Sequence, residues 1–123
     1  MPLIATASYP HVMNGLFAPD AKQPVFLVFY SAITPSTGQM WCPDCRDVES
    51  TVKTTFDEPD KPKAVIIWLE REEWRKRDNE ARAKWNVQNL PTILRLQDGK
   101  ETGRLVESEI LDARKLQRLV QNE

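Results

Sequence analysis

The sequence predicts an α/β protein in which a mixed β-sheet is covered by helices on both faces. Three observations carry this prediction: two continuous apolar runs, a segment of helical length between them, and a hairpin signal near the carboxyl end. The runs Val25–Tyr30 and Ala64–Leu69 are rich in β-branched and aromatic residues, which is typical of strands buried on both faces. Two such strands joined through a helix predict a parallel βαβ unit.

The segment between the two apolar runs predicts a loop followed by a helix. Residues Ser31–Met40 are mostly polar and include Pro35 and Gly38, so we expect them to form a loop. The helix begins at a cysteine motif and runs to about Phe56, where Asp57-Glu58-Pro59 ends it.

The carboxyl third predicts a β-hairpin and a closing helix. Strands over Thr92–Leu96 and Glu101–Val106 flank Asp98-Gly99, a dipeptide typical of hairpin turns. The second of these strands alternates apolar and polar residues, as expected of a half-exposed edge. The closing helix has a buried stripe made of Ile110, Leu111, Leu116, Leu119 and Val120.

Two further segments have weaker patterns. A short first helix is expected at His11–Phe17, closed by Ala18-Pro19-Asp20. The charged stretch Glu70–Trp85 mixes both signs and predicts a helix over at least its second half. Its plainest interpretation is a solvated helix that a few apolar contacts anchor, namely Trp74, Ala81 and Trp85.

Length and composition limit the classes of protein that fit. A chain of 123 residues predicts one domain over residues 1–123. A net charge of −1 argues against general binding to nucleic acid or to anionic membranes. No apolar run approaches the length of about 20 residues that crosses a bilayer. Since the amino terminus lacks a secretory signal, we expect the cytoplasm, unless a signal has been removed.

The two cysteines, Cys42 and Cys45, indicate redox chemistry. They lie three positions apart, and a bridge that closes so short a loop adds little stability. A structural role therefore explains the pair poorly, whereas a C-x-x-C spacing beside a βαβ pattern is typical of thiol–disulfide exchange.

The predicted helix start makes this pair asymmetric. Pro43 occupies the first helical position, where its missing N–H costs nothing. We expect the N–H groups of the first turn, including that of Cys45, to point to the Cys42 sulfur and, with the helix dipole, to favour its thiolate. Asp44 suits the dipole but repels a thiolate, so the two influences oppose each other. Cys45, one turn inside, is less exposed and can attack a mixed disulfide.

Two alternatives to redox chemistry fit the residues less well. A structural zinc site needs four ligands, and His11 is the only other soft ligand in the sequence, so we expect no metal. Inert core cysteines do not account for a motif that is so well arranged for a helix start.

The motif Trp41-Cys42-Pro43-Asp44-Cys45 resembles the active site of the fourteen-kilodalton thioredoxin-related proteins, the family of thioredoxin domain-containing protein seventeen. Three other segments carry the resemblance, which runs from about Val25 to the carboxyl end: the loop Tyr30–Met40, Lys84–Thr92 and Leu105–Glu109. The resemblance implies the thioredoxin fold and a fungal or other lower-eukaryote origin.

The resemblance also implies roles for the site residues. Cys42 is the attacking cysteine and Cys45 the resolving one. Pro91 is expected to be cis and to face the pair, leaving the backbone at Leu90 and Thr92 to bind an extended substrate. A strand-initiating proline is the alternative for Pro91.

Trp41 and the long loop are expected to shape access to the cysteines. Trp41 shields them and offers a flat contact, with an ordinary core aromatic as the alternative. The loop is longer than in ordinary thioredoxins, and its tip, Thr34–Gln39, would crowd large folded substrates while admitting small disulfides. The alternative is a tolerated surface insertion.

One departure concerns the resolving step. Ordinary thioredoxins carry a buried aspartate below the resolving cysteine, and Phe29 is assigned to the matching place here. Deprotonation of Cys45 then depends on water or on another carboxylate, and Asp44 is the nearest in sequence.

The resemblance implies a monomeric disulfide reductase of the cytoplasm. Its expected substrates are cystine, particular protein disulfides and nitrosothiols. It binds no cofactor, and its electrons come from NADPH through thioredoxin reductase. Two alternatives stay open: a disulfide oxidase or isomerase, and a redox-regulated binding module that holds its partner around Trp41 and Pro91.

Overall fold

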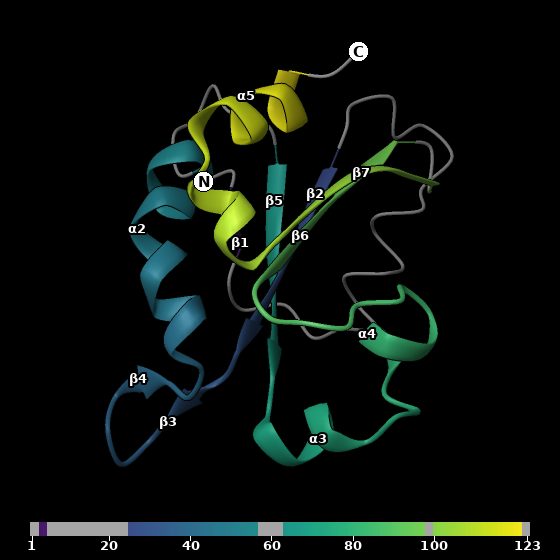
Figure 1. The fold of residues 1–123 in the computed structure, drawn as a ribbon. Helices are drawn as coiled ribbons and strands as arrows, with labels where there is room; N and C mark the ends of the chain where they lie inside the picture. The colour runs from purple at the N-terminus through teal and green to yellow at the C-terminus, as the bar shows by residue number, and fades with distance from the viewer. Residues whose placement is uncertain (1–2, 5–24, 57–62, 98–99, 122–123) are drawn as a thin grey trace.

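A central five-stranded sheet organises the chain (Figure 1). The computed structural model describes residues 3–4, 25–56, 63–97 and 100–121. In spatial order the strands are β1 (Leu3–Ile4), β5 (Lys63–Leu69), β2 (Val25–Ser31), β6 (Thr92–Gln97) and β7 (Lys100–Val106).

Strand β2 lies at the centre of this sheet and pairs on both sides. It runs parallel to β5, with Phe26 opposite Ala64 and Tyr30 opposite Trp68. It runs antiparallel to β6, which in turn is antiparallel to β7. The predicted βαβ unit and the closing hairpin are therefore confirmed, although the turn at Asp98-Gly99 lies outside the described residues.

Strand β1 is an edge strand that the sequence did not predict. It pairs in parallel with β5, with Leu3 opposite Ala64. Two residues are too few to give an alternating pattern, which explains the omission. The helix predicted at residues 11–17 lies outside the described residues.

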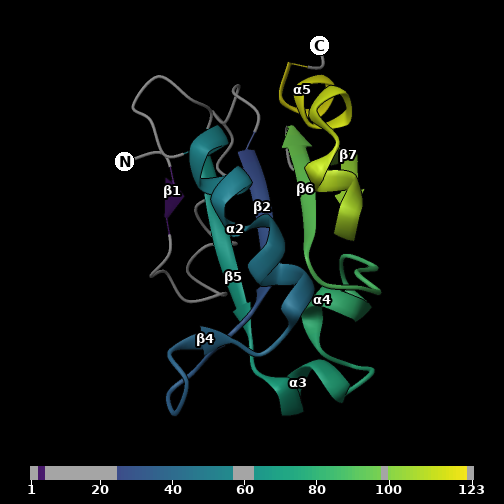
Figure 2. The ribbon, with the colours of Figure 1, turned by 60° about the vertical axis from the view of Figure 1, so that its left-hand side comes forward.

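Helices cover both faces of the sheet (Figures 1 and 2). Helix α2 (Pro43–Phe56), the 3₁₀ helix η1 (Glu107–Leu111) and α5 (Ala113–Gln121) lie on one face, and α4 (Glu80–Ala83) lies on the other. Helix α2 buries four side chains at helical spacing: Cys45, Val48, Val52 and Phe56. The Phe56 ring packs against Phe26 of β2 with centroids 5.1 Å apart. Among the described residues, no helix is long and apolar enough to cross a membrane.

The closing helix is divided, which corrects the prediction of one continuous stripe. The Asp112 carboxylate accepts the backbone N–H groups of Arg114 and Lys115, so α5 begins anew after η1. Ile110, on the inner side of η1, is fully buried, whereas Leu111 is 49% exposed. Because α5 starts at a new cap, its apolar face does not continue that of η1, and Leu111 is left exposed.

The expected loop at Ser31–Met40 contains a small hairpin, so the prediction of a loop throughout was wrong. Strands β3 (Ile33–Thr34) and β4 (Gln39–Met40) pair antiparallel. At its tip the Thr34 carbonyl accepts the N–H of Gly38 at 2.8 Å, and Gly38 has a positive φ of 71°. Glycine tolerates this left-handed conformation without a steric cost.

The charged stretch forms two short helices. Helix α3 (Arg71–Arg75) lies in its first half and α4 in its second. Asn79 separates them, because its side-chain amide donates to three carbonyls at the end of α3 and its oxygen accepts the Arg82 N–H. The predicted helix in the second half is confirmed, and the first half, which the prediction left open, contains a second short helix.

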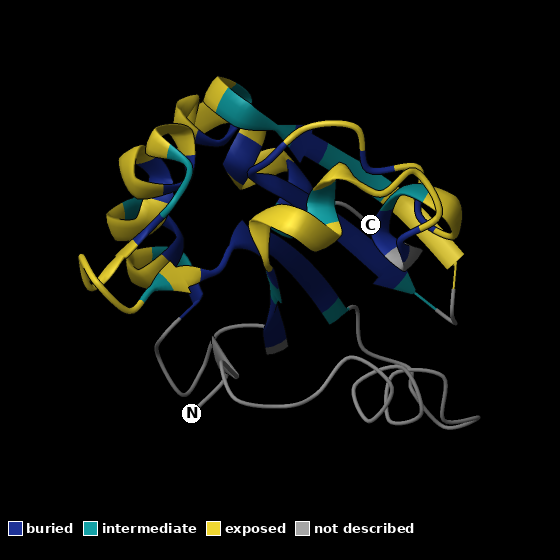
Figure 3. Cartoon of the chain, turned by 90° about the horizontal axis from the view of Figure 1, so that it is seen from below, coloured by how far each residue is buried: buried dark blue, intermediate teal, exposed yellow. Residues whose placement is uncertain are grey.

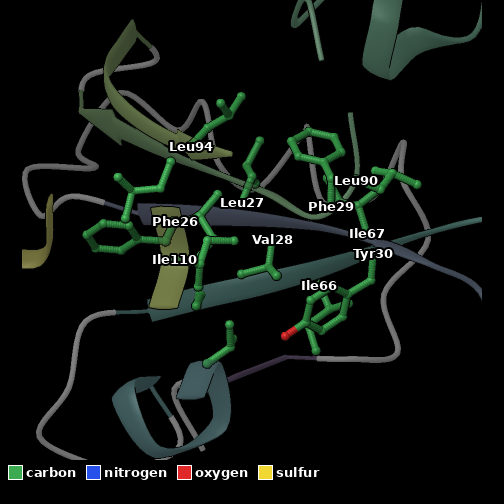
Figure 4. Packing of buried hydrophobic residues seen from close by; sticks show 14 of the residues in the cluster. Phe26, Leu27, Val28, Phe29, Tyr30, Ile66, Ile67, Leu90, Leu94 and Ile110 are labelled. Atoms are coloured by element: carbon green, nitrogen blue, oxygen red, sulfur yellow. The ribbon is translucent and has the colours of Figure 1, made fainter. Parts of the chain in front are cut away.

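The core lies between the sheet and its helices, which expose their outer sides (Figure 3). Strand β2 is buried on both faces, so its side chains point alternately to the two sides. Figure 4 shows Phe29 and Tyr30 on opposite sides of this strand. This alternation decides which side chains of β2 reach the cysteine helix.

Candidate active site

The start of α2 places the two cysteines in different environments. Helix α2 begins at Pro43, as predicted, so Cys42 directly precedes the helix and Cys45 lies in its first turn. Both are free thiols; Cys42 is partly exposed and Cys45 is completely buried. The predicted difference in exposure is confirmed, and only Cys42 can meet a substrate from solvent.

Ser31 connects both cysteines to the end of β2. Its hydroxyl accepts the backbone N–H of Cys42 at 3.1 Å, and its own N–H donates to the Cys45 sulfur at 3.4 Å. Sequence reasoning missed this residue. The available signal was its position, since Ser31 is the first polar residue after the apolar run that leads to the motif.

The hydrogen bonds of the first turn differ from the prediction. The Cys45 N–H donates to the Cys42 carbonyl at 3.1 Å rather than pointing to the Cys42 sulfur. The Cys42 thiol instead donates to the Leu90 carbonyl, with sulfur and oxygen 3.8 Å apart. In this dithiol form the Cys42 sulfur therefore faces the segment that precedes Pro91.

The Leu90–Pro91 peptide bond is cis, as the resemblance implies. The Pro91 carbonyl accepts the N–H of Glu107 at 2.8 Å, which connects this segment to η1. Thr92 is fully buried, and its hydroxyl donates to the Asn89 carbonyl at 2.6 Å. The Thr92 side chain thus supports the segment from within, and the predicted contact of Leu90 and Thr92 with substrate stays a prediction.

Trp41 lies beside the cysteines and is partly buried. Its indole N–H donates to the Leu69 carbonyl at 2.9 Å, and the Arg71 guanidinium lies 5.8 Å from the ring centroid. The ring is therefore held against the end of β5 with part of its surface open to solvent.

Asp44 lies on the exposed side of the first turn of α2. It lines a hollow of about 80 Å³, together with Asp47, Val48, Glu107, Ser108 and Leu111. This hollow lies between α2 and η1, so Asp44 faces η1.

The assignment of Phe29 to the place below Cys45 was wrong. Phe26 packs on Phe56 of α2, so the side chains of β2 that share its face point to the cysteine helix. Tyr30 shares that face, and Phe29 points to the other side (Figure 4). Tyr30 therefore faces the cysteine helix together with Phe26, and it is a second residue that the sequence did not identify.

Burial raises the pKa of the Cys45 thiol to about 12. The hydrogen bonds from Ser31 lower it in part, and the neighbouring Cys42 charge raises it. Cys45 is consequently a neutral thiol at physiological pH, and it must lose a proton before it can attack a disulfide.

Metal binding has no support in the described part of the chain. It contains no group of three or more histidine, cysteine, aspartate or glutamate side chains that could hold an ion. His11, the remaining soft ligand, lies outside that part.

Comparison with known proteins agrees with the geometry. Residues 9–122 match the family described as "Thioredoxin domain-containing protein 17-like, thioredoxin domain". The thioredoxin-like protein Clot of Arabidopsis thaliana is 31% identical over 84 residues, which are 65% of this chain and 63% of that protein.

Solved thioredoxins share the fold. Thioredoxin f2 of Chlamydomonas reinhardtii superposes with a TM-score of 0.69 at 13% identity, covering 98% of each chain. Thioredoxin of Fasciola hepatica gives 0.63 at 21% identity, covering 96% of this chain and 99% of its own. The predicted thioredoxin fold is thereby confirmed, while a fungal or lower-eukaryote origin stays a prediction. Because the family match spans nearly all of the sequence, the chain belongs to the thioredoxin domain-containing protein 17-like family of the thioredoxin superfamily.

Proposed function

We propose that this protein is a disulfide reductase in which Cys42 attacks and Cys45 resolves. One observation supports the assignment above all others: a partly exposed Cys42 thiol faces the Leu90 carbonyl, and a fully buried Cys45 lies one turn inside the helix. An attacking sulfur has to meet the substrate, whereas a resolving sulfur has to meet only its neighbour.

The reaction runs in two exchange steps. The Cys42 thiolate attacks one sulfur of the substrate disulfide, a mixed disulfide forms, and the other substrate sulfur leaves as a thiolate. Cys45 then loses its proton and attacks the Cys42 sulfur, so that the second substrate thiolate leaves. The substrate gains two electrons, and the cysteines are oxidised to a Cys42–Cys45 disulfide.

The electron source is proposed from family membership. NADPH, through thioredoxin reductase, would return the disulfide to the dithiol, and no cofactor would be bound. We place this monomeric reductase in the cytoplasm, where the glutathione and thioredoxin systems keep thiols reduced.

The proposed substrates are cystine, particular protein disulfides and nitrosothiols. The β3–β4 hairpin supports a selective site, because it leads directly into Trp41 and is joined to α2 by a bond from Arg46 to the Gln39 side chain at 2.8 Å. We expect this hairpin to hinder the approach of large folded substrates more than that of small ones.

Turnover of cystine and insulin by the full chain, with NADPH and thioredoxin reductase, tests the proposal. We expect rapid oxidation of NADPH with cystine and slow reduction of insulin. Cys42→Ser should abolish both reactions, and Cys45→Ser should accumulate mixed disulfides that mass spectrometry detects. No exchange with any disulfide, while both thiols can be titrated, would refute the proposal.

Two further outcomes would favour the alternatives. A strongly oxidising reduction potential would indicate an oxidase or isomerase. Full biological activity of Cys42→Ser would indicate a binding module, because binding alone does not need the attacking sulfur.

A further inference from the structure

Glu107 is a charged residue at the site that the two exchange steps leave unused. Its backbone N–H donates to the Pro91 carbonyl at 2.8 Å, one residue after the Leu90 carbonyl that accepts the Cys42 thiol. Its carboxylate accepts the side-chain amide of Asn89 at 3.2 Å, in the amide orientation that the surrounding acceptors assign. Glu107 therefore contacts the residues on both sides of Leu90, through its backbone on one side and through its carboxylate on the other.

The backbone fixes the direction of this side chain. Glu107 has a positive φ of 52°, in the left-handed region that a residue with a Cβ atom seldom adopts. The bond to Pro91 holds it there, at the point where β7 ends and η1 begins. The side chain is only partly exposed, and its carboxylate is kept at the segment that precedes the cis proline.

Two further carboxylates share the surroundings of Glu107. Asp44 and Asp47, on the exposed side of α2, line the same hollow of about 80 Å³. In the described part of the chain none of the three forms an ion pair, because the two salt bridges found there join other residues. The negative charge on this flank of the site is therefore not neutralised by a lysine or arginine among the described residues.

The cations near the cysteines lie on the other flank. Arg71 is 5.8 Å from the centroid of the Trp41 ring, which is bonded to the end of β5. Arg46 is bonded to Gln39 of the β3–β4 hairpin. Strands β5 and β6 lie on opposite sides of β2, and the cis proline leads into β6 (Figure 1). A substrate that extends along the segment before the cis proline therefore meets carboxylates rather than guanidinium groups.

We propose that Glu107 is a specificity-determining residue through which the site prefers disulfides with ammonium or neutral groups beside the sulfurs to disulfides with carboxylates there. The inference rests on the proposed function and narrows its substrate class. An ammonium group two carbons from the reacting sulfur is attracted by the Glu107 carboxylate, whereas a carboxylate at that position is repelled. Among protein substrates the same field favours cysteines flanked by lysine or arginine.

Three disulfides with arms of the same length and different charge measure this preference. Cystamine carries two ammonium groups, bis(hydroxyethyl) disulfide is neutral, and dithiodipropionate carries two carboxylates. The second-order rate constant for oxidation of the reduced full chain by each disulfide is obtained by counting the remaining thiols over time. The ratio of variant to wild type is the readout, because the intrinsic reactivity of each disulfide cancels in it.

Glu107→Gln keeps the size of the side chain and removes its charge. We expect this variant to react about two- to fivefold more slowly with cystamine, about two- to fivefold faster with dithiodipropionate, and at an unchanged rate with bis(hydroxyethyl) disulfide. Added salt should reduce the wild-type preference more than that of Glu107→Gln, because salt screens the carboxylate. Glu107→Lys should reverse the direction of the preference.

Glu49→Gln is the matched control. It removes the same charge from an exposed position of α2 that lies outside the hollow, about 140° around the helix from Asp44. All three rates should stay unchanged in this variant. Should Glu107→Gln fail to fold, Asp47→Asn decides instead, since it removes an exposed charge from the same hollow. Changes in the same directions are then expected, and unchanged rates would overturn the inference.

The remaining outcomes also decide the question. An equal change with all three disulfides in Glu107→Gln would indicate that this residue only supports the fold, and it would overturn the inference, as would unchanged rates. A charge-dependent change of the same size in Glu49→Gln would overturn it as well and would assign the preference to the net charge of the protein. The reductase itself would stand in each case. Failure of the reduced wild type to react with any of the three disulfides would instead contradict the proposed function.

Discussion

Ser31 holds the backbone of Cys42 in place, because its hydroxyl accepts the Cys42 backbone N–H at 3.1 Å. The same residue donates its own N–H to the Cys45 sulfur and lowers the pKa of that thiol in part. One residue at the end of β2 therefore holds the backbone of Cys42 and lowers the pKa of Cys45 in part.

Replacing this hydroxyl tests both effects. Ser31→Ala should lower the free energy of unfolding by about 1 kcal/mol, because the partly buried Cys42 N–H loses its acceptor. It should also slow the second exchange step, because the Ser31 side chain lowers the pKa of the Cys45 thiol in addition to the backbone N–H, which this variant keeps. Urea unfolding and single-turnover kinetics measure the two effects, with Ser36→Ala on the exposed hairpin tip as the matched control. Equal behaviour of the two variants would show that Ser31 has neither role.

The Tyr30 hydroxyl has no hydrogen-bond partner among the described residues, which predicts a gain in stability when it is removed. Tyr30→Phe keeps the ring beside Trp68 and deletes the buried oxygen, so we expect the free energy of unfolding to rise by about 1–3 kcal/mol. Tyr30→Leu removes the ring as well and should reduce stability, which makes it the control for packing. Urea denaturation of the reduced proteins measures both changes. A less stable Tyr30→Phe would mean that the hydroxyl has a partner in solution.

Several elements could be predicted from the sequence because their signals are local. The runs that form β2 and β5 are apolar throughout, and Pro43 marks the start of α2. The hairpin of β3 and β4 has two residues per strand, too few for an alternating pattern. The division before α5 depends on the Asp112 carboxylate, which accepts the N–H groups of Arg114 and Lys115, and an aspartate before a helical run is a local N-cap signal that the prediction of one continuous stripe did not use.

The error at Phe29 has a different physical origin. A strand buried on both faces is apolar at every position, so its sequence does not tell which residues share a face. The contact of Phe26 with Phe56 shows which face of β2 lies against the cysteine helix, and Tyr30 is on that same face. The parts of the site on α2 could therefore be predicted, whereas the part that β2 contributes could not.

The buried Cys45 thiol predicts a loss of stability at alkaline pH. Its pKa is about 12 in the folded protein, and a thiol in the unfolded chain ionises near about 8.5. The folded state keeps the proton longer, so the stabilisation is complete below about pH 8.5 and is lost as pH rises to 12. We expect the free energy of unfolding to fall by about 1.4 kcal/mol per pH unit in this window.

Urea titrations of the reduced protein between pH 7 and 11 measure this slope, and Cys45→Ala should remove it below about pH 10. Above that pH the slope should persist in Cys45→Ala, because burial also raises the pKa of Tyr30. An unchanged slope between pH 8.5 and 10 in Cys45→Ala would show that this thiol is not the group responsible.

The hairpin of β3 and β4 leads to a prediction about substrate size that follows from the proposed function. Thr34 pairs with Gln39, and residues Pro35–Gly38 form the tip between them. Replacing those four residues by Asn-Gly keeps the strands paired through a two-residue turn and removes the projecting tip. If the tip excludes folded substrates, insulin reduction should rise several-fold while cystine reduction stays within about twofold. Ser36→Gly, which keeps the full length, is the control. An unchanged ratio of insulin to cystine turnover would mean that the hairpin is a tolerated insertion, and selectivity would then have to come from Trp41 and the segment at Pro91.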